Sequence, residues 1–174
     1  MIFDSGVLAD KKLIILYFLC KMGMPLAKSQ ITNAMLESNL IDFFTSQQCI
    51  SELEESGMIK QMIHQKKQCF TITDSGKNAI EIFEQRISKN TSEIIDNYTS
   101  KNKEILRKES QVIAEYNKIN DKEYVVNLKV IEKELVLMDL KLNVVSAKQA
   151  KQVCEKWKNS SEKIFGQLIG SLIN

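Results

Sequence analysis

The chain has little of what most enzymes depend on. Its 174 residues include one histidine and six glycines, and they contain no Gly-rich phosphate loop, no GxSxG and no HExxH motif. Because His64 is the single histidine, the usual acid–base arrangements lack their commonest member. We therefore expect a protein without enzymatic activity, without catalytic residues and without a cofactor.

Long hydrophobic runs are also missing. The longest run, from Leu13 to Cys20, is much shorter than the about 20 residues of a membrane-spanning helix. Asp4 and Asp10 bracket a short apolar start that lacks the pattern of a signal peptide. These features predict a cytoplasmic protein that does not act at a membrane.

The four cysteines are widely scattered, and no CxxC pair occurs. No cysteine lies at metal-ligand spacing from His64, so the sequence gives little support to a zinc site. Buried free thiols in a reducing compartment are the better interpretation. The residues concerned are Cys20, Cys49, Cys69 and Cys154.

Apolar residues at helical spacing predict three helices in the first third of the chain. The first covers residues 10–22, with Asp10 as its N-cap. Residues 26–38 form the second helix and residues 45–56 the third. The third helix ends at Gly57, because glycine readily takes the left-handed conformation that follows a helix.

The connection between the second and third helices carries large apolar side chains over residues 40–44. We expect Leu40 and Phe43 to fold inward and to fix the turn. The two helices would then form a helix-turn-helix.

A β-hairpin follows the third helix. Residues 58–64 and 68–73 are rich in β-forming side chains, and residues 65–67 form a short turn between them. Thr73 or Asp74 is expected to cap a fourth helix. Its apolar stripe consists of Ala79, Ile80, Phe83 and Ile87.

The second half of the chain changes period. A polar connecting helix runs to about residue 107, and residues 111–119, 124–132 and 135–145 then read as strands. Ser146 is expected to cap a long last helix. We predict an α+β fold with a first domain at residues 1–87 and a second at 88–174, the latter a three-stranded antiparallel sheet covered by a helix.

Two segments of the first half resemble a known class of proteins. Residues 53–59 (LEESGMI) and 70–77 (FTITDSGK) are similar to the "LEExGLI … YxLTxxGxxAL" pattern of PadR- and MarR-like winged-helix regulators. Residues 124–130 (YVVNLKV) and the helix from Ala147 to Trp157 resemble the tail of a bacterial winged-helix family of unknown function. The resemblance implies an N-terminal winged helix-turn-helix and a role in transcription regulation.

In such a fold the third helix enters the major groove of double-stranded DNA. It begins with polar residues, of which glutamine can pair bidentately with adenine. Lysines at the tip of the hairpin suit phosphate or minor-groove contacts, and polar residues at the start of the second helix suit the DNA backbone. The predicted DNA contacts are Lys28, Gln30, Thr45, Ser46, Gln47, Gln48, Ser51, Lys66 and Lys67.

The charge of this half opposes tight DNA binding. The whole chain has a net charge of +2, and residues 1–87 carry nine basic and ten acidic side chains, a net charge of −1. Because phosphate neutralisation supplies most non-specific affinity, we expect modest binding and a shallow salt dependence. A homodimer that presents two copies of this half (the head, residues 1–87) to a short inverted repeat would offset part of this deficit.

Other interpretations stay open. A winged helix that docks on protein and not on DNA fits the net charge of the head. The C-terminal module is expected to dimerise or to sense a small-molecule or protein effector, with Trp157 either beside the ligand or in the core. The stripe from Ile80 to Tyr98 forms either core or a dimer seam, and the lysines of the last helix form a solvated face or a second nucleic-acid surface.

Overall fold

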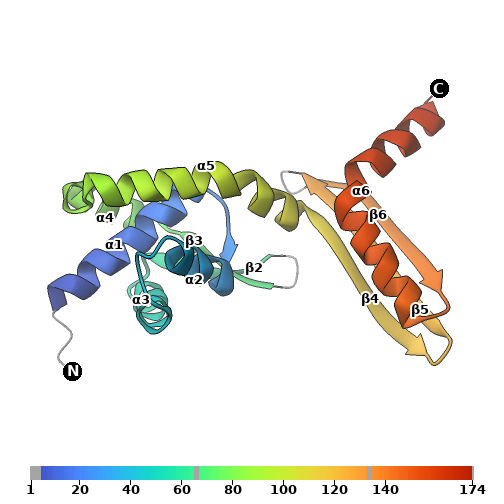
Figure 1. The fold of residues 1–174 in the computed structure, drawn as a ribbon, viewed down its shortest axis with the longest axis horizontal. Coiled ribbons are helices and arrows are strands. Elements are labelled where there is room, and N and C mark those ends of the chain that lie inside the picture. Colours follow the sequence, from blue (N-terminus) through green and yellow to red (C-terminus); the bar gives the residue numbers. More distant parts are fainter. Residues whose placement is uncertain (1–4, 65–66, 133–134, 174) are drawn as a thin grey trace. The chain divides into compact units, whose positions relative to one another are not determined.

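The computed structural model describes residues 5–64, 67–132 and 135–173 (Figure 1). Across these residues the chain is α+β, with six α-helices and two three-stranded antiparallel sheets. Its contacts divide it into two compact units, Met1–Glu104 and Ile105–Asn174. In the described part of the chain, none of the helices combines the length and the apolar character that crossing a membrane requires.

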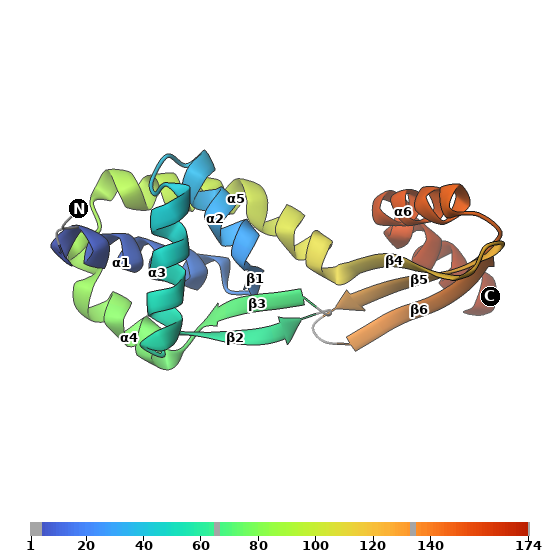
Figure 2. The same ribbon diagram turned by 90° about the horizontal axis from the view of Figure 1, so that it is seen from below.

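The first unit consists of helices packed on a small sheet (Figure 2). Strand β3 lies at the centre of that sheet, between β1 and β2. The register pairs Leu26 with Phe70 and Ile59 with Ile72. The elements in chain order are α1 (Ser5–Met22), β1 (Leu26–Ala27), α2 (Lys28–Glu37), α3 (Phe43–Glu55), β2 (Ile59–His64), β3 (Lys67–Ile72), α4 (Asp74–Phe83), a 3₁₀ turn (Glu84–Arg86) and most of α5 (Lys89–Gln111).

Helix α1 is the centre of the first core. Ile15, Leu16 and Leu19 are almost completely buried, and burying each such side chain contributes about 1.5–3 kcal/mol. The inward residues of α3, Ile50 and Leu53, are fully buried as well. The helical spacing of these apolar residues predicts both α1 and α3 from the sequence. In α3, the same spacing leaves the opposite face of the helix toward solvent.

Glycine and threonine end and begin the helices as expected. Gly23 and Gly57 have φ angles of 64° and 71°, a left-handed conformation that glycine adopts without steric cost. Thr73 caps α4, since its Oγ1 accepts a hydrogen bond from the backbone N–H of Gly76 at 3.2 Å. The same hydroxyl lies 3.0 Å from the carbonyl oxygen of Met58, so it also ties α4 to the start of the hairpin.

The first helix begins earlier than the sequence pattern indicated. Helix α1 already includes Ser5, so the prediction of Asp10 as its N-cap is wrong. Asp10 lies inside the helix, where its carboxylate forms an ion pair with Arg86 at 2.6 Å. The acidic side chain has a partner on another segment and therefore does not need the backbone N–H groups of a helix start.

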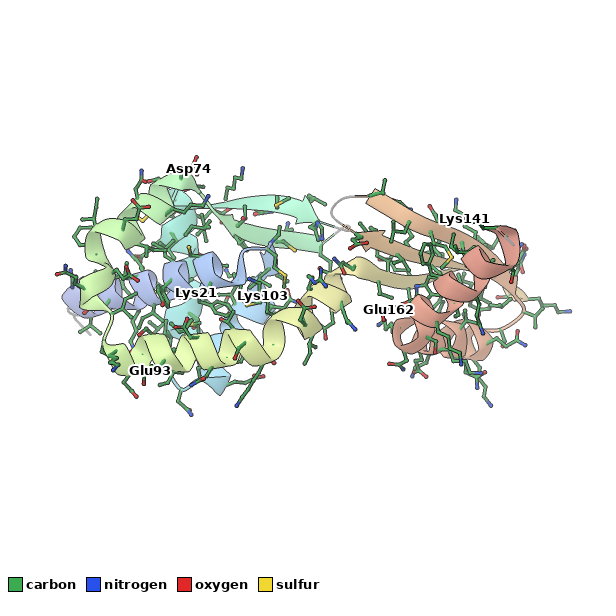
Figure 3. All side chains as sticks on the ribbon, turned by 90° about the horizontal axis from the view of Figure 1, so that it is seen from above. Lys21, Asp74, Glu93, Lys103, Lys141 and Glu162 are labelled. Atoms are coloured by element: carbon green, nitrogen blue, oxygen red, sulfur yellow. The ribbon has the colours of Figure 1, made fainter. Side chains whose placement is uncertain are left out.

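The division between the units lies after Glu104, whereas the sequence pattern placed it at residues 87–88. The reason is that α5 packs on α1. The rings of Phe18 and Tyr98 meet edge to face at 5.9 Å, and the Lys103 ammonium donates to the carbonyl oxygen of Lys21 at 3.0 Å (Figure 3). Most of the connecting helix thus belongs to the first unit.

The second unit is an antiparallel sheet followed by a long helix, as predicted. The strand order is β4-β5-β6, so that β4 and β6 are the edges of the described sheet. Ser146 precedes the helix, and its hydroxyl accepts from the backbone N–H of Gln149 at 3.2 Å. The elements are β4 (Val112–Asn120), β5 (Glu123–Glu132), β6 (Leu135–Val144) and α6 (Ala147–Ile173).

One face of this sheet carries the second core. Val126 and Leu128 of the central strand are buried beneath α6. The helix contributes Ala150, Cys154 and Trp157, which are spaced three or four residues apart and so lie on one side of it. The opposite face carries polar and charged residues, including an ion pair between Lys129 and Asp139 at 2.8 Å.

Candidate nucleic-acid interface

Helix α3 is started by Asp42, whose side chain fits the N-cap position. One of its carboxylate oxygens accepts from the backbone N–H of Thr45 at 3.0 Å, and the other accepts from the Thr45 hydroxyl at 2.6 Å. These hydrogen bonds lower the pKa of Asp42, the side-chain bond contributing most. Thr45 is therefore engaged in forming the helix start, although it stays partly exposed.

Two of the predicted contacts lie on the open face of α3. Gln48 is exposed and Ser51 is half-buried, and their spacing puts both on the same side of the helix. The Gln48 amide donates to Glu52 at 2.8 Å. The glutamine expected to read a base therefore holds a carboxylate instead in the free protein.

Glu52 has a second partner. Its carboxylate meets the Lys12 ammonium at 2.5 Å, with about a third of each side chain exposed. The hydrogen bond from Lys12 is the main cause that lowers the pKa of Glu52, and the bond from Gln48 adds to it. The Glu52 carboxylate therefore stays ionised beside Gln48. It also pairs with Lys12, so the charge of this lysine is compensated within the protein.

Two other predicted contacts face inward. Ser46 is fully buried, which removes it from the DNA-contacting surface. Gln47 donates from its amide to the hydroxyl of Thr32 at 2.9 Å, and Thr32 is itself buried. The hydrogen bond of Gln47 lies where α3 meets α2. Ser46 precedes the inward positions Cys49 and Ile50 by three and four residues and so lies on the same side of the helix.

The two residues at the start of α2 that are predicted to contact DNA differ in whether their side chains are already bound within the protein. The side chain of Gln30 accepts from the backbone N–H of Ala27 at 2.9 Å, an interaction that caps the helix. Lys28 is partly exposed. Of the two, Lys28 is the better candidate for a contact with phosphate.

The structure describes one of the two lysines predicted to contact DNA from the tip of the hairpin. Lys67 opens β3 and is exposed. Lys66, the other lysine predicted to contact DNA, lies outside the described residues. The described part of the candidate surface therefore rests on Gln48, Ser51, Lys28 and Lys67.

An exposed aromatic pair at the start of α3 was not foreseen. Phe43 is 50% exposed and Phe44 81%, and their rings meet edge to face at 5.5 Å. The prediction that Phe43 folds inward is wrong: Ile41, which is 4% exposed, is the buried side chain of that connection. Helical spacing could have found Phe44, because it lies four residues before Gln48 and hence on the same open face.

Trp157 does not line the open groove of the second unit. Trp157 is buried, and its indole N–H donates to the carbonyl oxygen of Lys129 at 3.3 Å. This makes it an anchor of the core. An open groove of about 480 Å³ lies instead beside β4, lined among others by Tyr116, Cys154 and Lys158.

Comparison with known proteins gives one result. Searches of the curated proteins and of the solved structures find no match to the chain. The family model described as a domain of unknown function (DUF4364) matches residues 11–172, which is nearly the whole chain. The chain therefore belongs to the DUF4364 family.

Proposed function

We propose that this protein is a winged-helix transcription regulator that binds double-stranded DNA as a homodimer. The observation that carries the proposal is the element order α1-β1-α2-α3-β2-β3 together with the pairing of β1 with β3. In a winged helix-turn-helix with this order, the counterpart of α3 enters the major groove and the counterpart of the β2–β3 hairpin is the wing, which supports these roles for α3 and the hairpin.

The open face of α3 supports the proposal in part. Gln48 and Ser51 offer amide and hydroxyl groups of the kind that contact base edges. Lys67 on the hairpin and Lys28 at the start of α2 supply positive charge. The single head remains poor in cations, so two heads are needed to bind a DNA site with useful affinity.

A mobility-shift experiment at low salt tests the proposal. We expect the wild-type protein to retard a subset of fragments from its own genome. Gln48→Ala is expected to weaken binding of the homodimer to preferred fragments about thirtyfold or more, because each of the two heads loses a bidentate base contact that contributes about 1–3 kcal/mol. Lys67→Gln is expected to weaken binding to all fragments alike, since phosphate contacts carry no sequence information.

The control is Lys122→Gln, which removes a lysine from an exposed turn of the second unit. It should bind DNA like the wild type. Binding that is equally insensitive to Gln48→Ala and Lys67→Gln would show that α3 and the hairpin do not form the DNA-contacting surface.

A second candidate function is protein docking through the same surface. It is favoured by the exposed pair of Phe43 and Phe44, because aromatic side chains are enriched at protein interfaces. The acidic residues Glu52, Glu54 and Glu55 in the second half of α3 suit a basic partner protein.

The two candidates respond differently to Phe44→Ser. A docking module should lose its partner with this variant and should not be retained on DNA or heparin in either form. A DNA-binding regulator should keep most of its non-specific DNA affinity, because that affinity comes from lysines.

A further inference from the structure

Strand β6 is an unusual edge. It is ten residues long and consists mostly of large apolar side chains, and β5 is its only neighbour in the described sheet. Leu135 is 65% exposed and Leu142 41%. Such an edge offers unpaired backbone N–H and C=O groups for pairing with another strand, and proteins normally protect it.

The charges of β6 specify what that other strand is. Asp139 and Lys141 are the two charged residues of the strand, and both lie on the face away from α6. In a symmetric antiparallel pair of two β6 strands centred on Leu140, Asp139 of each copy lies opposite Lys141 of the other. Centring the pair on Asp139 or on Lys141 would instead place like charges opposite each other, which is unfavourable.

The apolar residues fit the same register. With Leu140 on the two-fold axis, Met138 of one copy lies opposite Leu142 of the other, on the face that α6 covers. The strand pairs regularly with β5 from Met138 to Val144, after a register shift near Ile131, so this segment is straight enough to pair on its outer side as well.

The other edge strand does not offer this match. Glu115 and Lys118 of β4 are three residues apart and so point to opposite faces. No symmetric register places them against each other. A register shift between Lys118 and Asn120 also interrupts the strand, which is one of the ways in which natural edges avoid pairing.

The end of α6 supplies a second observation. Its buried side, from Ala150 to Ser161, continues into Leu168 and Leu172 at the same helical spacing. At this point α6 has passed the end of the sheet that it covers, and Leu172 is 76% exposed. In Figure 1 the last turns of α6 extend past the sheet on the side of β6.

We propose that two copies of this chain join through β6 in the Leu140-centred register, so that their sheets form one continuous six-stranded antiparallel sheet. Both α6 helices then cover the same face, and the end of each helix lies over the sheet of the partner. A short strand pair alone buries less surface than the about 1,200–2,000 Å² of a stable interface. The apolar ends of α6 supply the additional area.

This inference deepens the homodimer part of the proposed function and rests on it. It is tested by charge reversal at the seam. Lys141 is exposed (Figure 3) and faces the neutral Asn127 within its own sheet, so Lys141→Asp leaves the pair of Lys129 with Asp139 intact. In the dimer it creates two contacts between aspartates.

We expect Lys141→Asp to raise the Kd for dimerisation at least about tenfold, measured by sedimentation velocity over a range of concentrations. The matched control is Lys148→Asp, which makes the same change of charge on the exposed side of α6. It should dimerise like the wild type. Circular dichroism checks that both variants are folded.

A mixing experiment tests the register itself. Asp139→Lys alone places lysine against lysine and should also weaken the dimer. When Asp139→Lys and Lys141→Asp chains are mixed, each seam contact again joins a lysine to an aspartate. We therefore expect a heterodimer that is tighter than either variant's homodimer, whereas failure to form it would overturn the register.

The outcomes separate this inference from the proposed function. A Lys141→Asp protein that dimerises like the wild type overturns the β6 seam and leaves homodimerisation standing. A wild-type protein that stays monomeric at tens of micromolar overturns both. DNA retention by the α3 surface is measured independently, in the mobility-shift experiment on Gln48→Ala and Lys67→Gln.

Discussion

At the residue scale, Gly76 is the position where a single methyl group should matter most. A Cβ there would lie 2.3 Å from the carbonyl oxygen of Met58 and 2.8 Å from Ile72. Because one obstacle is backbone, Gly76→Ala is expected to lower the free energy of unfolding by about 1–3 kcal/mol or more.

The matched control for this substitution is Gly166→Ala. No atom lies within 4 Å of a Cβ at Gly166, and the residue is inside α6. Alanine should therefore stabilise the helix by roughly 0.5–1 kcal/mol. Urea denaturation followed by circular dichroism measures both effects, and equal effects of the two substitutions would contradict the packing at Gly76.

The cysteines give a second prediction at this scale. Cys20 is exposed, whereas Cys49, Cys69 and Cys154 are buried. Burial raises the pKa of the Cys49 thiol to about 11, so at neutral pH it stays protonated and unreactive. A thiol reagent should modify one cysteine rapidly in the native protein and all four in urea.

The variant Cys20→Ser identifies the reactive residue. Its native form should show no rapid modification while its folding is unchanged. Rapid reaction of a second thiol in the native wild type would mean that one of the buried cysteines is accessible.

At the scale of elements, helix α3 carries both the favourable and the unfavourable groups of the candidate surface. Glu52 holds Gln48 and Lys12 in the free protein. Glu52→Gln removes a negative charge and releases the Lys12 ammonium. We expect DNA affinity to rise by about 1 kcal/mol, or roughly fivefold, which fluorescence anisotropy would measure.

A nearby carboxylate provides the control for that change. Glu55→Gln removes the same charge from the exposed end of α3 without releasing a lysine. Its effect on DNA affinity should be smaller. Unchanged affinity with Glu52→Gln would place the middle of α3 away from the DNA.

The elements themselves were largely predictable from sequence. The hairpin, the three strands of the second unit and the helix capped by Ser146 follow from alternation and capping patterns, which act over a few residues. The burial of Ser46 depends on which side of α3 faces the core, and the engagement of Gln47 by Thr32 depends on the contact of α3 with α2. That contact joins residues far apart in sequence, and the polar character of these side chains gave no sign of it.

The exposed start of α3 was missed for a related reason. Ile41 and Phe43 are both large and apolar, and composition alone does not decide which of them enters the core. The position of Asp10 inside α1 likewise involves Arg86, a partner more than seventy residues away.

At the scale of the whole molecule, a dimer joined through the second unit should become more stable to unfolding as the protein concentration rises. Trp157, the single tryptophan, lies in the core of that unit, so its fluorescence reports the unit's unfolding. We expect the thermal midpoint of this signal to rise with protein concentration. The dependence should be much weaker in Lys141→Asp, and a midpoint independent of concentration in the wild type would argue against the dimer.

If two cation-poor heads act together on double-stranded DNA, the salt dependence of the binding constant reveals it. Each head presents a few lysines, so the dimer should make about 4–6 phosphate contacts, and the logarithm of the binding constant should fall with the logarithm of salt concentration with a slope of roughly −4 to −5. In Lys67→Gln the slope should become shallower by about 2, one phosphate contact from each head. A wild-type protein that shows no DNA binding even at the lowest salt, or a slope that Lys67→Gln leaves unchanged, would overturn the proposal that two heads bind DNA together through their hairpins.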